Sequence, residues 1–92
     1  MPELPAESGS VRSEVVLQIL MTVLPGLNVS IDVSNVSGRT LITLVKDGSP
    51  EVYRLPAMVP RRMLGRLANK YGVRIEFFYR PEMCCRGTTT KQ

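Results

Sequence analysis

The sequence contains no histidine and no tryptophan, and its only two cysteines are adjacent near the C-terminus. Without histidine, the ligand spacings typical of zinc sites are missing, and no serine or cysteine has a recognisable base partner. A glycine-rich phosphate loop is also missing, and the carboxylates are scattered without a spacing that implies a catalytic pair. We therefore expect a protein that is not an enzyme and has no metal, no cofactor and no small-molecule substrate.

The two cysteines, Cys84 and Cys85, exclude a disulfide framework. Neighbouring cysteines rarely bond to each other, because the peptide between them hinders disulfide geometry. We interpret them as unpaired thiols in a loose tail, with palmitoylation or intermolecular pairing as the alternatives. This cysteine usage favours a reducing compartment, and hence a cytoplasmic protein.

A long hydrophobic run is missing as well. The most apolar stretch, residues 15–24, contains Gln18 and Thr22 and is too short and too polar to cross a bilayer. The residues before it are acidic, whereas basic residues precede the apolar part of a signal peptide. The sequence therefore predicts a protein with no membrane contact.

The remaining composition is sufficient for one small folded domain. A chain of 92 residues with 43% hydrophobic content can bury one core but is too short for two domains. Because only five residues are aromatic, valine, leucine, isoleucine and methionine must supply most of the packing. We expect a disordered lead over residues 1–9, a single domain over residues 10–81 and a flexible tail over residues 82–92.

Two segments have the pattern of helices. The first is predicted over residues 10–24, from the N-cap residue Ser10 to the Pro-Gly pair that follows. Its polar positions form one narrow stripe, Glu14, Gln18 and Thr22. Such a helix is covered on most sides, so we expect it to pack on a sheet and to contact a partner or a second copy. The second helix is predicted from Pro60 to the residue before Gly72, which suits a left-handed C-cap.

Alternation and β-branched content predict four strands, over residues 27–33, 40–46, 51–55 and 73–80. Residues 34–39 form a predicted turn, and residues 47–50 are predicted to form a hairpin loop that is looser than a two-residue turn. The order α-β-β-β-α-β indicates an α+β two-layer sandwich. We expect a three-stranded antiparallel meander plus a C-terminal strand, with two helices packed on the sheet.

Residues 67–73, LANKYGV, are similar to the first helix and turn of a helix-turn-helix. In that motif the turn is followed by a recognition helix long enough to lie in the major groove. Here the alternating residues that follow favour a strand, so we do not expect a helix-turn-helix. The α-β-β-β-α order is also similar to the double-stranded-RNA-binding fold, but only in topology, and it implies no site residue.

Positive charge is concentrated in one part of the chain. Residues 54–80 carry seven basic residues and one acidic residue, whereas residues 1–53 have a net charge of −3. This asymmetry favours an anionic partner. Arg62, Arg66 and Lys70 recur every fourth residue along one side of the second helix, about 6 Å apart, which suits contacts with successive phosphates.

We predict a nucleic-acid-binding surface in which these three side chains neutralise phosphates and Phe78 stacks on an unpaired base. The other arginines of the segment would extend the positive field. The full set is Arg61, Arg62, Arg66, Lys70, Arg74, Phe78 and Arg80. The alternative for the basic row is an ordinary solvated helix face.

Two hypotheses about function follow. The first is a non-catalytic binding module that contacts nucleic acid, RNA rather than duplex DNA. The second is a protein-interaction or assembly module, homodimeric through the apolar first helix, in which the basic face is solvated or contacts an acidic protein.

Overall fold

The structure of the protein is a computed structural model that describes residues 9–83. The proposed disordered lead and flexible tail, with Cys84 and Cys85, lie almost entirely outside the described residues, so these predictions stay predictions. The elements in chain order are β1 (Val11–Arg12), α2 (Ser13–Val23), the 3₁₀ helix η1 (Leu24–Leu27), β2 (Val29–Val36), β3 (Arg39–Lys46), β4 (Ser49–Leu55), β5 (Met58–Val59), α3 (Arg61–Tyr71) and α4 (Glu76–Tyr79).

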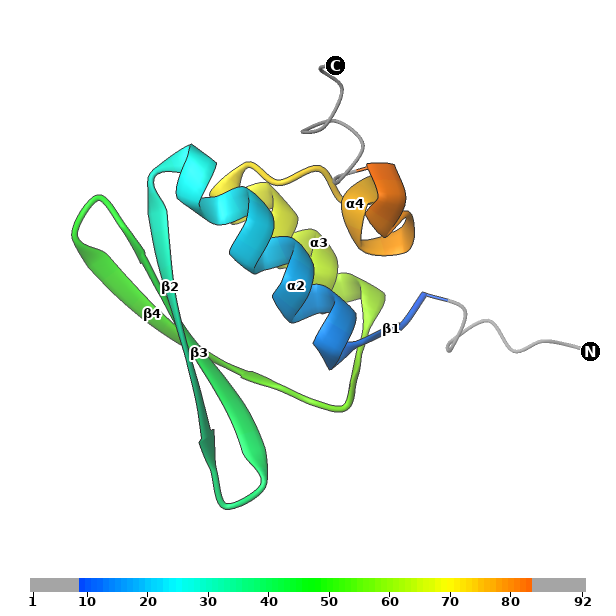
Figure 1. Cartoon of the computed structure of the whole chain (residues 1–92), viewed down its shortest axis with the longest axis horizontal. Coiled ribbons are helices and arrows are strands. Elements are labelled where there is room, and N and C mark those ends of the chain that lie inside the picture. Colours follow the sequence, from blue (N-terminus) through cyan, green and yellow to red (C-terminus); the bar gives the residue numbers. More distant parts are fainter. Residues whose placement is uncertain (1–8, 84–92) are drawn as a thin grey trace, which may run out of the picture.

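The predicted three-stranded antiparallel meander is confirmed, with the strand order β2-β3-β4 (Figure 1). Both of its hairpins close through two residues with positive φ, Ser37-Gly38 and Asp47-Gly48, which is the geometry of type I′ turns. The expectation of a looser loop over residues 47–50 was wrong. Residues 49–50 already pair with β3, because a type I′ turn matches the twist of the strands it joins.

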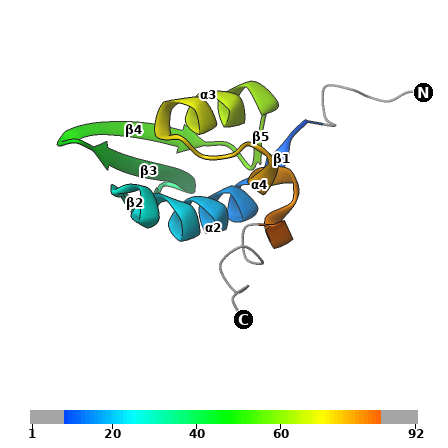
Figure 2. The ribbon, with the colours of Figure 1, turned by 90° about the horizontal axis from the view of Figure 1, so that it is seen from above.

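One face of the sheet packs into the core and the other is open. On β3, the alternating residues Ile42 and Leu44 are fully buried, whereas Leu41, Thr43 and Val45 point to the opposite face and are half-buried. Both long helices lie on the buried side, α2 beside β2 and α3 beside β4 (Figure 2). The α+β two-layer sandwich is therefore confirmed.

The first helix begins later than predicted. Ser10 is not its N-cap, because residues 11–12 form β1, which pairs with β5 and buries Val11 against Val59. Arg12 occupies the N-cap position without a side-chain cap bond. The α-helix ends at Val23 and continues as η1, so the Pro-Gly pair tightens the chain into a 3₁₀ turn.

The second helix, α3, agrees with its prediction. Gly72 adopts the left-handed conformation at its C-cap, and its amide donates to the carbonyl of Ala68. Leu64, Leu67 and Tyr71 are buried on one side of the helix, at the three- and four-residue spacing that is typical of an amphipathic helix. The other side is free to carry charge.

The predicted strand over residues 73–80 was wrong. Residues 76–79 form the one-turn helix α4, which contacts α2 and buries Phe78. The segment has too few residues for its apolar pattern to separate a strand from a helical turn, and packing against α2 decides between them. Instead of a fourth strand on the meander, the structure has the short second sheet of β1 and β5.

Candidate nucleic-acid interface

The basic row of α3 lies on the helix side opposite the core. Arg62, Arg66 and Lys70 are all exposed, one helical turn apart. Among the described residues, no carboxylate lies within ion-pair distance of Arg62 or Arg66. The positive charge of these two guanidinium groups is therefore not neutralised within the described part of the fold.

A small cleft opens beside this row, between α3 and β4. It encloses about 230 Å³ and is lined by Tyr53, Pro60, Arg62, Met63, Arg66 and Leu67. The lining combines an aromatic ring and aliphatic side chains with two guanidinium groups. The cleft therefore offers apolar contact and positive charge to the same ligand.

The third member of the row is partly neutralised. The Lys70 ammonium lies 3.1 Å from a carboxylate oxygen of Glu51 on β4, and the Lys46 ammonium donates to the Lys70 carbonyl at 3.3 Å. The side chains of Lys70 and Glu51 are each nearly half exposed, so this ion pair is weak. Lys70 therefore remains available to an anion, at the cost of competing with Glu51.

The remaining predicted arginines lie on the other flank of α3 or beyond it. The Arg61 guanidinium lies 5.8 Å from the centre of the Tyr79 ring on α4. Arg74 follows the helix and lies 3.5 Å from the Glu76 carboxylate, with its guanidinium over the Phe77 ring. Arg80 is exposed at the end of α4. The seven predicted residues thus do not form one continuous surface. Arg62 and Arg66 line the cleft, and Lys70 lies one helical turn further along the same exposed side of α3.

Phe78 does not belong to this surface. Its side chain is 1% exposed in the core, so it is not accessible to a base and the predicted stacking role fails. The aromatic residue at the cleft is Tyr53, which is not among the predicted site residues. Its place in the alternating residues 51–55 put it on the same face as Leu55, but only the packing of α3 on β4 brings it beside the arginines.

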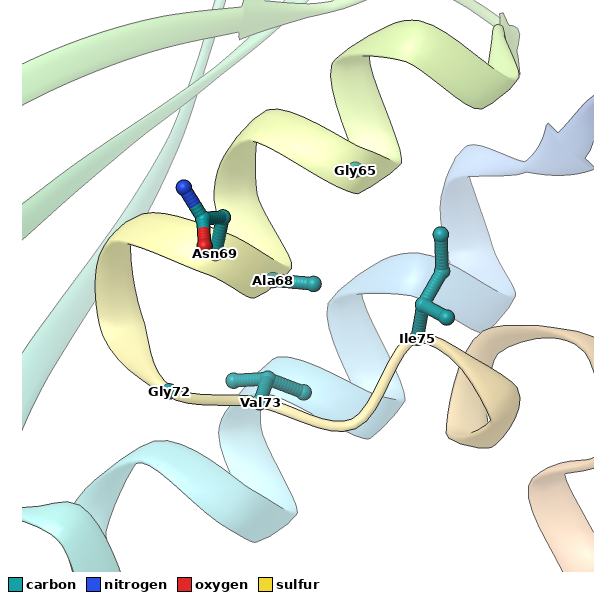
Figure 3. Close-up of a pocket in the computed structure, with 6 residues that line it drawn as sticks. All are labelled: Gly65, Ala68, Asn69, Gly72, Val73 and Ile75. Atoms are coloured by element: carbon teal, nitrogen blue, oxygen red, sulfur yellow. The ribbon is translucent and has the colours of Figure 1, made fainter.

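The opposite flank of α3 carries a second, shallower groove of about 450 Å³ (Figure 3). Gly65 and Ala68 form one wall, and Ile75 faces Gly65 from the segment that leads to α4. The groove has no charged residue and only Asn69 as a polar side chain. Apart from Asn69, its lining offers no side-chain group that would select a ligand.

The helix α4 decides whether residues 67–73 belong to a helix-turn-helix. A helix does follow the turn after α3, contrary to the predicted strand, but it has only four residues and buries Phe78. Such an element is too short to lie in a major groove as a recognition helix. The helix-turn-helix motif is therefore excluded by the shortness and burial of α4, and not by a strand as the sequence predicted.

No protein-family model, no curated protein and no solved structure matches this chain. Within residues 9–83 there is no group of three metal-ligating side chains. No helix in the described part of the chain is long and apolar enough to cross a membrane. The cleft and its basic row are therefore the features of the structure that bear on function.

Proposed function

We propose that the protein is a small non-catalytic module that binds nucleic acid, RNA rather than duplex DNA, through the basic row of α3. The observation that carries this proposal is the placement of Arg62 and Arg66. Both are exposed, stand one turn apart beside an apolar cleft, and have no carboxylate of the described residues within reach. A guanidinium in this setting can bind a phosphate through two hydrogen bonds.

The placement of these charges opposes helix stability. Arg61 and Arg62 occupy the first turn of α3, which has no acidic residue, and the helix dipole is already positive there. Like charges at i and i+4, such as Arg62 and Arg66, cost a few tenths of a kcal/mol more. A surface that only contacts water does not require cations at the N-terminal end of the helix, whereas a surface that binds anions does.

The preference for RNA over duplex DNA follows from the surroundings of α3. A helix that reads the major groove must enter it with its flanks free. One flank of α3 is closed by β4, and the Glu51 carboxylate stands beside the basic row there. A flexible single strand can lie along the exposed side of the basic row, because binding it does not require α3 to enter a groove. We expect this activity in the cytoplasm.

The test is a titration with labelled single-stranded RNA at several salt concentrations. Three phosphate contacts predict that log K falls with log salt with a slope of about −2, since each contact on a single strand contributes about 0.7. Arg62→Gln should reduce the slope by about 0.7. Arg39→Gln is the matched control, because Arg39 is exposed at the β2–β3 hairpin end, which projects beyond the helices (Figure 1).

Equal effects of the two substitutions would show that binding depends on net charge and not on α3. Absence of any RNA binding at low salt would refute the proposal outright. Duplex DNA of the same length is included in the titration, and tighter binding to the duplex would contradict the stated preference.

A second candidate is a protein-interaction or assembly module, favoured by the open face of the sheet. Val36 and Val52 on that face are 53% and 65% exposed, beside the half-buried Leu41 and Val45. The apolar side of α2, by contrast, buries Val16, Ile19 and Leu20 within the chain, so α2 is a weaker candidate for a dimer contact. Sedimentation of the pure protein tests this alternative, which predicts self-association reduced by Val52→Thr.

A further inference from the structure

We propose that the cleft between α3 and β4 receives one unpaired nucleobase, which packs against the Tyr53 ring while its neighbouring phosphates bind Arg62 and Arg66. This inference rests on the proposed function and names the part of the RNA that is recognised. It replaces Phe78, which is buried, with an aromatic residue that lies beside the arginines.

The lining of the cleft selects a ligand that is both flat and anionic. Pro60, Met63 and Leu67 supply aliphatic surface next to the Tyr53 ring, which a bare phosphate would not use. The two guanidinium groups at the same cleft would gain nothing from a neutral apolar ligand. A nucleotide unit suits both parts of the lining. The apolar face of its base can contact the aromatic and aliphatic side chains, and its negatively charged phosphate can bind the guanidinium groups.

The size of the cleft limits the ligand to one such unit. Its volume of about 230 Å³ lies below the roughly 300–1,000 Å³ that is typical of pockets for drug-sized molecules. A duplex cannot enter it, and neither can a peptide helix. A single base that is splayed out of a flexible strand is the nucleic-acid group that fits.

Tyr53 is held in place before any ligand arrives. Its ring meets the Tyr71 ring edge to face, with ring centres 6.3 Å apart and an interplanar angle of 79°. The two phenol oxygens lie 3.1 Å apart, and Tyr71 itself is 3% exposed. A ring fixed in this way loses little conformational freedom on binding, which makes it an effective stacking surface.

The first test compares three ligands on the wild-type protein: a short single-stranded RNA, an abasic oligomer with the same number of phosphates, and an acidic peptide that carries an aromatic residue. The RNA should bind about fivefold or more tightly than the abasic oligomer, because base–aromatic contacts add to the phosphate contacts. Both oligomers should have the same salt slope, since they offer the same phosphates.

The second test compares Tyr53→Phe with Tyr53→Leu. The phenylalanine variant keeps the ring and should retain the preference for RNA over the abasic oligomer. The leucine variant keeps an apolar side chain but removes the ring, and should bind both oligomers with the affinity that wild type has for the abasic one. Thermal unfolding of both variants confirms that they are folded before binding is compared.

The outcomes separate this inference from the function on which it rests. Equal, salt-dependent binding of RNA and abasic oligomer would overturn the base-binding cleft and leave the phosphate-binding proposal intact. No binding of either oligomer at low salt would overturn both. Tighter binding of the acidic peptide than of RNA, lost in Tyr53→Leu, would show that the cleft is a peptide site and would also overturn the inference.

Discussion

The phenol oxygens of Tyr53 and Tyr71 lie 3.1 Å apart and join the edge strand β4 to the buried side of α3. The two rings meet edge to face, so this pair fixes both the position of the helix on the sheet and one wall of the cleft. The same contact therefore contributes to the stability of the fold and to the shape of the proposed binding surface.

The Tyr71 phenol should make the fold sensitive to alkali. Burial, helped by the hydrogen bond with Tyr53, raises the pKa of Tyr71 well above its ordinary value of 10.0. The unfolded chain then releases this proton at a lower pH than the folded chain, so the free energy of unfolding falls as the pH rises above about 10. Urea denaturation of wild type and Tyr71→Phe between pH 8 and pH 11 measures this.

The control for that experiment is the phenylalanine variant itself, which lacks the ionisable group. At pH 8 it should be less stable by about 0.5–1.5 kcal/mol, the usual loss for one hydrogen bond. Its stability should then decline less steeply above pH 10 than that of wild type. Parallel declines would show that Tyr71 is not the titrating group.

Phe78→Ala should act on stability and not on RNA binding. A fully buried phenylalanine costs about 3–5 kcal/mol when it is truncated to alanine. Phe77→Ala is the matched control, because the neighbouring ring is only partly buried and should cost less. Denaturant midpoints give the stabilities, and RNA titration of the folded variants gives the affinities.

The result that would contradict the buried position of Phe78 is easily recognised. If Phe78→Ala lowered RNA affinity while the free energy of unfolding stayed unchanged, the residue would have to be exposed. The strand predicted over residues 73–80 would then regain support.

Gly48→Ala should destabilise the β3–β4 hairpin. Gly48 has a φ of 79°, a conformation that costs a residue with a Cβ atom roughly 1–2 kcal/mol. Gly26→Ala is the matched control, since Gly26 does not have a positive φ and an added Cβ there would meet nothing within 4 Å. The control should be neutral or slightly stabilising in thermal unfolding, and equal losses in both variants would rule out the turn as the cause.

Glu51→Gln should strengthen RNA binding. The Glu51 carboxylate holds the Lys70 ammonium at 3.1 Å, and removing its charge frees Lys70 for a phosphate. Because an exposed pair of this kind is worth about 0.2–1 kcal/mol, we expect affinity at low salt to rise roughly 1.4- to fivefold. Asp32→Asn removes the same charge from the open face of the sheet and serves as the control.

If the control raised affinity as much as Glu51→Gln, the gain would reflect net charge alone. If neither substitution changed affinity, Lys70 would not belong to the binding row. The row would then consist of Arg62 and Arg66 only.

Periodicity and turn chemistry were sufficient for the second helix and for the order of the meander strands. The spacing of Leu64, Leu67 and Tyr71 defined the buried side of α3, and the same spacing put Arg62 and Arg66 on the exposed side. The alternation in β2 and β3 and the glycines of the turns were enough for the meander, because each depends on neighbours only a few residues away. These features follow from the sequence alone.

Tertiary packing decided what local pattern leaves open. Residues 76–79 became a helical turn because Phe78 is buried where α4 packs on α2, and an apolar run of that length is compatible with either structure. The cleft exists because α3 lies on β4, which brings Tyr53 beside Arg62 across a turn and a short strand. Contacts between segments that are distant along the chain leave no periodic pattern in the sequence. Only the folded structure therefore determines them.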